Sequence, residues 1–170
     1  MIKRISILIT ILIVAAIVFF WLRPHSKFLL TLMPPSDLYT PIVKEQIKID
    51  EKNRSSKLQA THNYVGTYLV GVYIKAPPPF GTPIESSAVL ALSIMENDRL
   101  VFKEKFTNWA SRFGGPGKNE SGVILGYYKV PKDIPLGGPI NAIVSIDNPD
   151  PIFEKKYGKA DFFIRRKSDQ

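Results

Sequence analysis

The chain has 170 residues, with 23 Lys and Arg against 15 Asp and Glu, which gives a formal net charge of +8. Its 10 Phe, 7 Tyr and 2 Trp exclude a largely disordered chain. The basic residues form no dense stripe interleaved with aromatic side chains, so we expect no nucleic-acid partner. Cysteine is absent, which excludes disulfides, thiolate nucleophiles, Cys-ligated zinc and a lipoprotein cysteine.

The N-terminal segment Ile5–Leu22 is apolar and carries no charged residue. As a helix rising about 1.5 Å per residue it would span about 27 Å, close to the hydrocarbon thickness of a bilayer. The segment therefore predicts one transmembrane helix, with Trp21 at the membrane interface. The side chains that we expect to contact lipid are Ile5, Leu8, Leu12, Val18, Phe20, Trp21 and Leu22.

A cleaved signal peptide is the alternative interpretation of this segment. Its apolar region would be shorter and would end in small residues, whereas this one ends in Phe19–Leu22, which favours an uncleaved anchor. Lys3 and Arg4 precede the segment, and Arg23 and Lys27 follow it. The short N-terminal tail and its charges favour an inside N-terminus, which in a bacterium places the rest of the chain in the periplasm.

The remaining chain has the size of one domain. We predict a membrane anchor with its flanks at 1–27, a juxtamembrane linker at 28–37, a periplasmic domain at 38–167 and a tail at 168–170. The apolar stretch Phe28–Met33 is ended by Pro34 and Pro35 and is too short to span a membrane. It would either lie along the membrane surface or pack on the domain.

Alternating apolar residues separated by turn residues predict about seven strands and no amphipathic helix after the anchor. The expected fold is all-β, an antiparallel β-sandwich of immunoglobulin-like or jelly-roll topology. The segment 107–121 is expected to be a loop. The strands are expected within 43–49, 64–74, 88–94, 100–106, 123–130 and 140–146, and around Phe162 and Ile164.

The clearest predicted hairpin joins strands at 88–94 and 100–106 through Asn97 and Asp98, two residues that accept the backbone angles of a tight turn. Alternation predicts that three side chains of the second strand face the core, namely Leu100, Phe102 and Phe106. Val101 and the lysines of the same strand would face outward.

Residues suited to catalysis or metal binding are few. With His25 beside the membrane, His62 alone cannot build a three-ligand zinc site, and no serine lies in a nucleophile elbow. Residues 114–118 lack the spacing of a phosphate-binding loop. Asp147–Asp150 could hold calcium, or could simply form a turn. We therefore expect no enzyme, no catalytic residue, no metal and no cofactor.

The segment from Trp109 to Lys118 is the strongest candidate for a protein-binding site. Trp and Arg contribute strongly to protein interfaces, and a glycine run lets the backbone adapt. The candidate contacts are Trp109, Arg112, Phe113 and Lys118. A buried Trp109 that fills the core is an equally open alternative.

The C-terminal third of the chain resembles small membrane-anchored β-sandwich proteins of Gram-negative envelopes. The segments that carry the resemblance are Tyr127–Gly138, Ile143–Asp147, Lys156–Lys159 and Phe163–Asp169. Some of these proteins are immunity proteins encoded beside secreted toxins. The resemblance rests on strands and turns, so it transfers no site residues. It implies a protein partner, either a secreted toxin or a subunit of an envelope complex, and an inner-membrane location.

Overall fold

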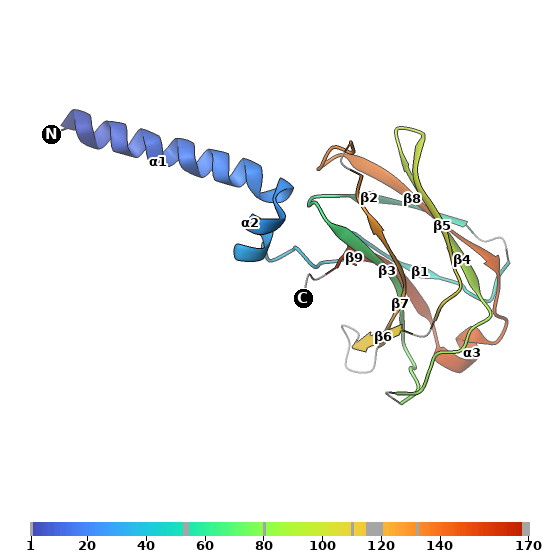
Figure 1. Cartoon of the computed structure of the whole chain (residues 1–170). Helices are drawn as coiled ribbons and strands as arrows, with labels where there is room; N and C mark the ends of the chain where they lie inside the picture. The colour runs from blue at the N-terminus through green and yellow to red at the C-terminus, as the bar shows by residue number, and fades with distance from the viewer. Residues whose placement is uncertain are drawn as a thin grey trace.

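The structure is a computed structural model, and it describes residues 2–52, 55–79, 81–109, 111–114, 121–131 and 133–167. Within the first helix, side chains are described at position 7 and from position 9 onward. A helical N-terminal part extends away from a β-sandwich (Figure 1). The fold is therefore all-β apart from this extension and one short helix, as the sequence predicts.

The sandwich consists of two antiparallel sheets. The five-stranded sheet has the order β1-β9-β3-β7-β6 and the four-stranded sheet the order β2-β8-β4-β5. The strands are β1 (Val43–Ile47), β2 (Ser55–Thr61), β3 (Thr67–Ile74), β4 (Val89–Glu96), β5 (Arg99–Phe106), β6 (Ser111–Gly114), β7 (Ser121–Lys129), β8 (Pro139–Asn148) and β9 (Ala160–Arg166).

The strand order is that of a jelly roll. Apart from the β4–β5 hairpin and the short strand β6, which pairs with β7, each strand is followed by one in the opposite sheet. This winding gives the four-strand orders β1-β9-β3-β7 and β2-β8-β4-β5, which are the two sheets of a jelly roll. Of the two topologies that the sequence left open, the structure has this one.

The core lies between the sheets. Alternate residues of β3 and β9 in one sheet face alternate residues of β4 and β8 in the other, and each such side chain is almost fully buried. Burying a side chain of this size contributes about 1.5–3 kcal/mol. The central members are Val70, Val72, Phe162, Ile164, Leu90, Leu92, Ala142 and Val144.

Strand β3 is buried on both faces, which explains why its sequence is apolar without alternation. Its inner side chains join the core, and its outer ones, Leu69 and Tyr73, form a second cluster with Phe163 of β9. The strand predicted within 64–74 is confirmed, and it is a central strand, since β3 lies between β9 and β7.

The predicted hairpin is confirmed, with one correction. Asn97 and Asp98 have φ angles of 46° and 63°, so both adopt the left-handed conformation of a tight two-residue turn. The register of β4 and β5 shifts between Ile94 and Met95. As a result Leu100 is 51% exposed, and the prediction that it faces the core is wrong.

Three elements differ from the predicted pattern. The whole of β2 lies where no strand was predicted, and β6 falls inside the predicted loop 107–121. The helix α3 (Phe153–Tyr157) has a single turn, which buries Phe153 and Tyr157 and ends at Gly158 with φ of 74°. One turn is too short to produce a periodic pattern.

The N-terminal part comprises α1 (Ile2–Leu22), a short 3₁₀ turn over Arg23–His25 and α2 (Lys27–Leu32). Leu30 of α2 is buried, whereas Phe28 is 72% exposed, so α2 both packs inward and presents an apolar side. The backbone N–H of Val65 donates to the Pro24 carbonyl at 3.0 Å, which ties this part to the sandwich. No helix within the described residues is both long enough and apolar enough to cross a membrane.

Candidate partner-binding site

Trp109, the first predicted partner contact, belongs to the core. The side chain is 3% exposed, its ring lies 5.2 Å from that of Phe153, and its indole N–H donates to the Ala88 carbonyl at 2.9 Å. A buried indole is stable there because its one polar atom has a partner. Trp109 is therefore not an exposed interface anchor, and the core alternative is the correct one.

Arg112 is engaged inside the protein. Its guanidinium donates to the carbonyls of Pro78, Pro79 and Thr82 at 3.0, 3.1 and 2.7 Å, and to the hydroxyl of Ser121 at 3.0 Å. These bonds hold the proline-rich connection between β3 and β4 against the edge of the five-stranded sheet. The guanidinium N–H groups of Arg112, which we predicted would contact a protein partner, therefore stabilise this loop.

Phe113 lies on the outer face of the five-stranded sheet, away from Trp109. Its ring meets those of Tyr73 and Phe163 edge-on at 6.0 Å, and the Arg165 guanidinium lies 4.7 Å above it. Lys118 lies outside the described residues. The structure therefore does not bring Trp109 and Phe113 together in one surface.

A groove of about 550 Å³ nevertheless opens beside Trp109. It is formed by the loops that precede β4, follow β5 and precede α3, at the end of the sandwich opposite the junction with α1 (Figure 1). Ile152 stands at its rim with 60% of its side chain exposed. The groove is lined by Ile84, Glu85, Ser86, Ser87, Thr107, Asn108, Trp109, Asp150, Ile152 and Lys156.

The chemistry of the groove suits an uncharged or weakly polar segment. Asp150 is buried, and its carboxylate accepts from the Ser86 hydroxyl at 2.9 Å and from the Ile152 N–H at 3.2 Å. Lys156 lies 3.6 Å from Glu85, and its pKa is raised, first by its hydrogen bond with Tyr157. Lys156 and Glu85 are thus paired, Asp150 is hydrogen-bonded to neutral groups, and Ile152 at the rim is left exposed.

The acidic turn at Asp147–Asp150 supports the fold. Asp147 forms an ion pair with Lys105 at 2.6 Å, and this interaction lowers the pKa of Asp147. The Asn148 amide donates to the Ser87 carbonyl at 2.7 Å. Among the described residues, no three His, Asp or Glu side chains are gathered in a way that could hold a metal ion.

His62 is a buried neutral residue. Its Nε2 lies 2.7 Å from the Tyr128 hydroxyl, and the two rings meet at 5.7 Å. Burial lowers the pKa of His62 to about 4, because the protein interior disfavours the charged imidazolium. Burial likewise raises the pKa of Tyr128, so neither group is ionised at neutral pH. The pair contributes to packing at this end of the core.

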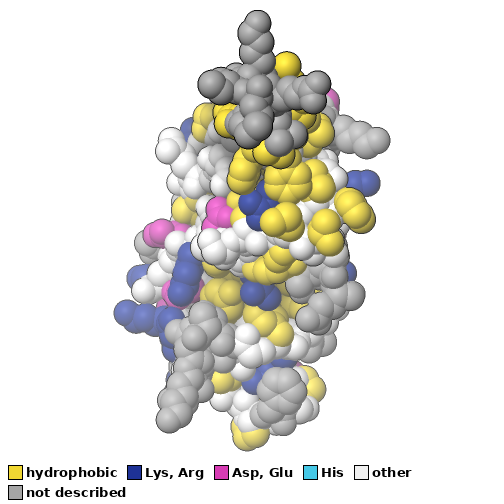
Figure 2. All heavy atoms as spheres, turned by 90° about the vertical axis from the view of Figure 1, so that its left-hand side faces the viewer, with side chains coloured by type: hydrophobic (Ala, Val, Ile, Leu, Met, Phe, Trp, Pro, Cys, Tyr) yellow, Lys and Arg dark blue, Asp and Glu magenta, His cyan; other side chains and the backbone are white. Residues whose placement is uncertain are grey.

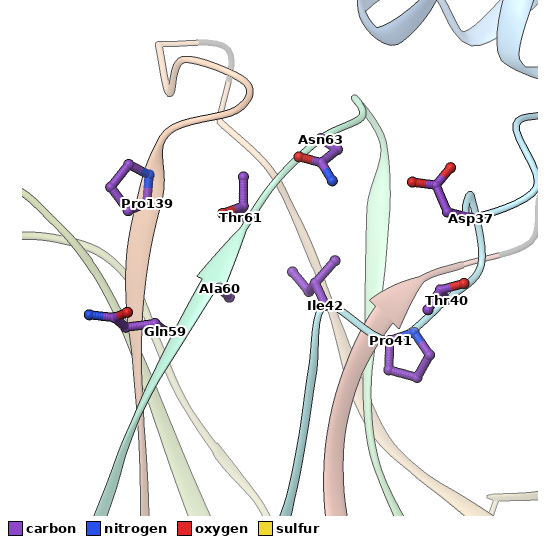
Figure 3. A pocket seen from close by; sticks show the side chains of 9 residues that line it. All are labelled: Asp37, Thr40, Pro41, Ile42, Gln59, Ala60, Thr61, Asn63 and Pro139. Carbon is purple, nitrogen blue, oxygen red and sulfur yellow. The ribbon is translucent and has the colours of Figure 1, made fainter.

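A second cavity, of about 350 Å³, lies at the seam between the edge strands β1 and β2 (Figure 3). Asp37 is the one charged side chain that lines it, and the Tyr64 hydroxyl donates to this carboxylate at 2.7 Å. Burial is the largest cause that raises the pKa of Tyr64 to about 12, followed by this hydrogen bond. Asp37 thus fastens the linker to the β2–β3 connection.

Comparisons with known proteins bear on the fold. No family model and no curated protein matches the chain. Among solved structures, the chain is similar to GEBA250068378 from Sulfurospirillum deleyianum, with a TM-score of 0.50 and 10% identity. The match covers 74% of this chain and 97% of that chain. At this identity the similarity shows a shared fold and carries no function.

Proposed function

We propose that this chain is a membrane-anchored periplasmic domain that binds a protein partner, and specifically an immunity protein that neutralises a secreted toxin. In this proposal Ile5–Leu22 spans the inner membrane with its N-terminus inside. Occlusion of a toxin requires no catalytic residue; it requires a complementary surface held where the toxin arrives.

The exposure of α1 carries the proposal. Successive residues of an α-helix are turned by about 100°, and Ile11, Leu12 and Ile13 are 59%, 62% and 54% exposed. The helix is therefore apolar around its whole circumference and stands away from the sandwich (Figure 1). Apolar surface of this kind is unfavourable in water and favourable in the hydrocarbon of a bilayer.

The groove beside Trp109 supports the binding role. It lies at the end of the sandwich opposite the junction with α1, so an anchored chain would present it away from the membrane (Figure 1). Its exposed Ile152 and paired charges suit contact with another protein, since interface centres are depleted of unpaired charge.

The alternative function is a structural or accessory subunit of an envelope assembly of the secretion or pilus type. The apolar circumference of α1 favours this alternative equally, because it could pack against other membrane helices as well as against lipid. The identity of the partner separates the two functions.

Membrane fractionation tests the anchor. The full chain should stay in the membrane pellet after an alkaline wash, and N-terminal sequencing should begin at Met1 or Ile2. Leu12→Arg should release part of the chain, because a cation at the centre of a span costs about 2.5–3.5 kcal/mol. Gln59→Arg, which adds the same charge to the sandwich, should release none. A mature start near Phe28 would refute an uncleaved anchor.

Copurification of the detergent-solubilised chain from its native cells tests the partner. Ile152→Asp should reduce partner recovery, whereas Leu100→Asp, at a comparably exposed apolar residue outside the groove, should not. Recovery of a secreted toxin supports the immunity function, and recovery of secretion or pilus subunits supports the alternative. A solubilised chain that recovers neither contradicts both.

A further inference from the structure

The outer face of the five-stranded sheet is defined by its strand register. Residues directly opposite one another in antiparallel strands share a face. Because Val70, Val72 and Ile164 point into the core, their neighbours point outward. The described side chains of this face include Lys44 and Gln46 of β1, Leu69 and Tyr73 of β3, Ile124, Tyr127 and Lys129 of β7, Phe113 of β6, and Asp161, Phe163 and Arg165 of β9, with Lys75 and Lys167 directly after their strands.

This face is strongly cationic. Its described side chains include five basic groups and one acidic group, Asp161. Asp161 forms ion pairs with both Lys44 at 3.7 Å and Lys75 at 3.0 Å. Lys129 and Lys167 are both exposed. The described side chains of this face therefore carry a net positive charge.

The same face is rich in aromatic rings. Tyr73 and Phe163 stack with their centroids 4.1 Å apart, and Phe113 packs against both. Cations lie above these and neighbouring rings: Lys44 is 5.5 Å from the Tyr73 ring and Lys167 is 4.8 Å from that of Tyr127. Tyrosines between basic side chains are typical of protein segments at the headgroup level of a bilayer.

The N-terminal helices point in the direction of this face. In Figure 1 α1 and α2 lie on the side of the sandwich on which β9, β3 and also β2 lie, while β4 and β5 lie on the other side. Figure 2 is viewed from the side on which the N-terminal end of α1 lies, and it shows apolar side chains with Lys and Arg among them below α1. Next to α1, α2 exposes Phe28 and Leu32 at 72% and 63%. If α1 crosses the membrane, this side of the sandwich faces the bilayer surface.

We propose that the outer face of the five-stranded sheet, together with α2, rests on the headgroups of an anionic phospholipid bilayer. The inference rests on the proposed membrane anchor. Lys129, Lys167 and Arg165 contact lipid phosphates, while Phe28 and Leu32 enter the headgroup region. Each lysine near an anionic surface strengthens membrane binding by about fivefold. This contact holds the sandwich flat on the membrane, with the groove beside Trp109 at the end of the sandwich away from the junction with α1.

Site-specific fluorescence quenching in vesicles tests the orientation. The chain contains no cysteine, so a single introduced cysteine can carry a fluorophore. Gln46→Cys places the fluorophore on the outer face of the five-stranded sheet, and Gln59→Cys places it on an exposed edge strand of the other sheet. The full chain is reconstituted in equimolar phosphatidylcholine and phosphatidylglycerol containing lipids with a nitroxide on the headgroup. Quenching should be severalfold stronger at position 46 than at position 59.

Charge substitutions test the chemistry of the contact. Lys129→Glu with Lys167→Glu should remove most of the quenching at position 46, and so should vesicles of phosphatidylcholine alone. The matched control, Lys57→Glu with Lys103→Glu, changes the charge by the same amount on the outer face of the four-stranded sheet and should leave quenching unchanged. Far-ultraviolet spectra verify that each variant is folded.

The possible outcomes separate this inference from the proposed function. If an alkaline wash removes the chain from the vesicles, the anchor and the inference are both wrong. If the chain is retained and quenching is equal at positions 46 and 59, the inference alone is wrong. The same holds if quenching at position 46 changes neither with the lipid charge nor with the lysine substitutions. If the fluorophore at position 46 is shielded only when a copurified protein partner is added, the face binds protein and the inference is wrong.

Discussion

Trp109 and Ile152 border the same groove, but Trp109 is buried and Ile152 is exposed. Substitutions of these two residues therefore distinguish a role in core packing from a role in partner binding. Trp109→Ala should lower the free energy of unfolding by about 3–5 kcal/mol, because it leaves a cavity beside Phe153 and an unpaired Ala88 carbonyl. Ile152→Ala should change it by less than about 0.5 kcal/mol. Urea unfolding of the full chain in detergent measures both values. A Trp109→Ala variant as stable as the parent would place the indole outside the core.

His62 makes the stability of the sandwich depend on pH. Its folded pKa of about 4 lies below the ordinary value of 6.5, so the unfolded chain binds the proton more readily. The stability contribution is therefore complete above about pH 6.5 and is lost as the pH falls toward about 4. At about 1.4 kcal/mol per pKa unit, the loss at low pH is about 3 kcal/mol.

The variant His62→Phe tests this dependence. It keeps an aromatic ring beside Tyr68 and Tyr128 and cannot be protonated. Its free energy of unfolding should fall less steeply between about pH 6.5 and pH 4 than that of the parent. Urea titrations at several pH values measure the slope. Parallel slopes in the two proteins would show that His62 is not the group responsible.

At the scale of elements, β3 passes close to its neighbours at Gly71. A Cβ atom at this position would lie 2.5 Å from the Val123 carbonyl oxygen and 2.6 Å from the Phe163 ring. Gly71→Ala should therefore destabilise the protein by about 1–3 kcal/mol, since the backbone of β7 cannot move without disturbing its pairing.

Gly114 of β6 provides the matched control for Gly71. No atom lies within 4 Å of the position that its Cβ would occupy. Gly114→Ala should consequently change stability by less than about 0.5 kcal/mol. Melting temperatures of the two variants, measured side by side, test the close approach of β3 and β7. Equal melting temperatures would contradict it.

Prediction from sequence succeeded for elements with a strong local signal. Apolar and polar side chains alternate along β4, β5, β7 and β8. The residues Asn97 and Asp98 specify the tight turn between β4 and β5. It failed for β6, a four-residue edge strand whose existence depends on pairing with β7. It also failed for the whole of β2, because the outward side chains of this edge strand are polar and its pattern resembles a loop.

At the scale of the whole molecule, the sandwich carries its own core. The main core contains no residue before Ile42, and the helical part meets the sandwich through contacts such as that of Val65 with Pro24. A truncated chain that starts at Pro35 should therefore fold, remain soluble and give a far-ultraviolet spectrum dominated by β-structure. A helical spectrum, or loss of cooperative unfolding, would show that the N-terminal helices are part of the folding unit.

The sequence by itself determined the β-class of the domain, the positions of β3, β8 and β9, and the apolar character of Ile5–Leu22. Each of these properties is local, because the alternation of apolar residues and the length of an apolar segment depend only on consecutive residues. The tertiary structure decided the jelly-roll order, the burial of Trp109 and the engagement of Arg112 with the proline-rich loop. These depend on contacts between segments distant in the chain: a tryptophan in a loop has the same local pattern whether it meets solvent or Phe153. The collection of lysines, arginine and aromatic rings on one face arises in the same way, from β1, β3, β6, β7 and β9 lying side by side.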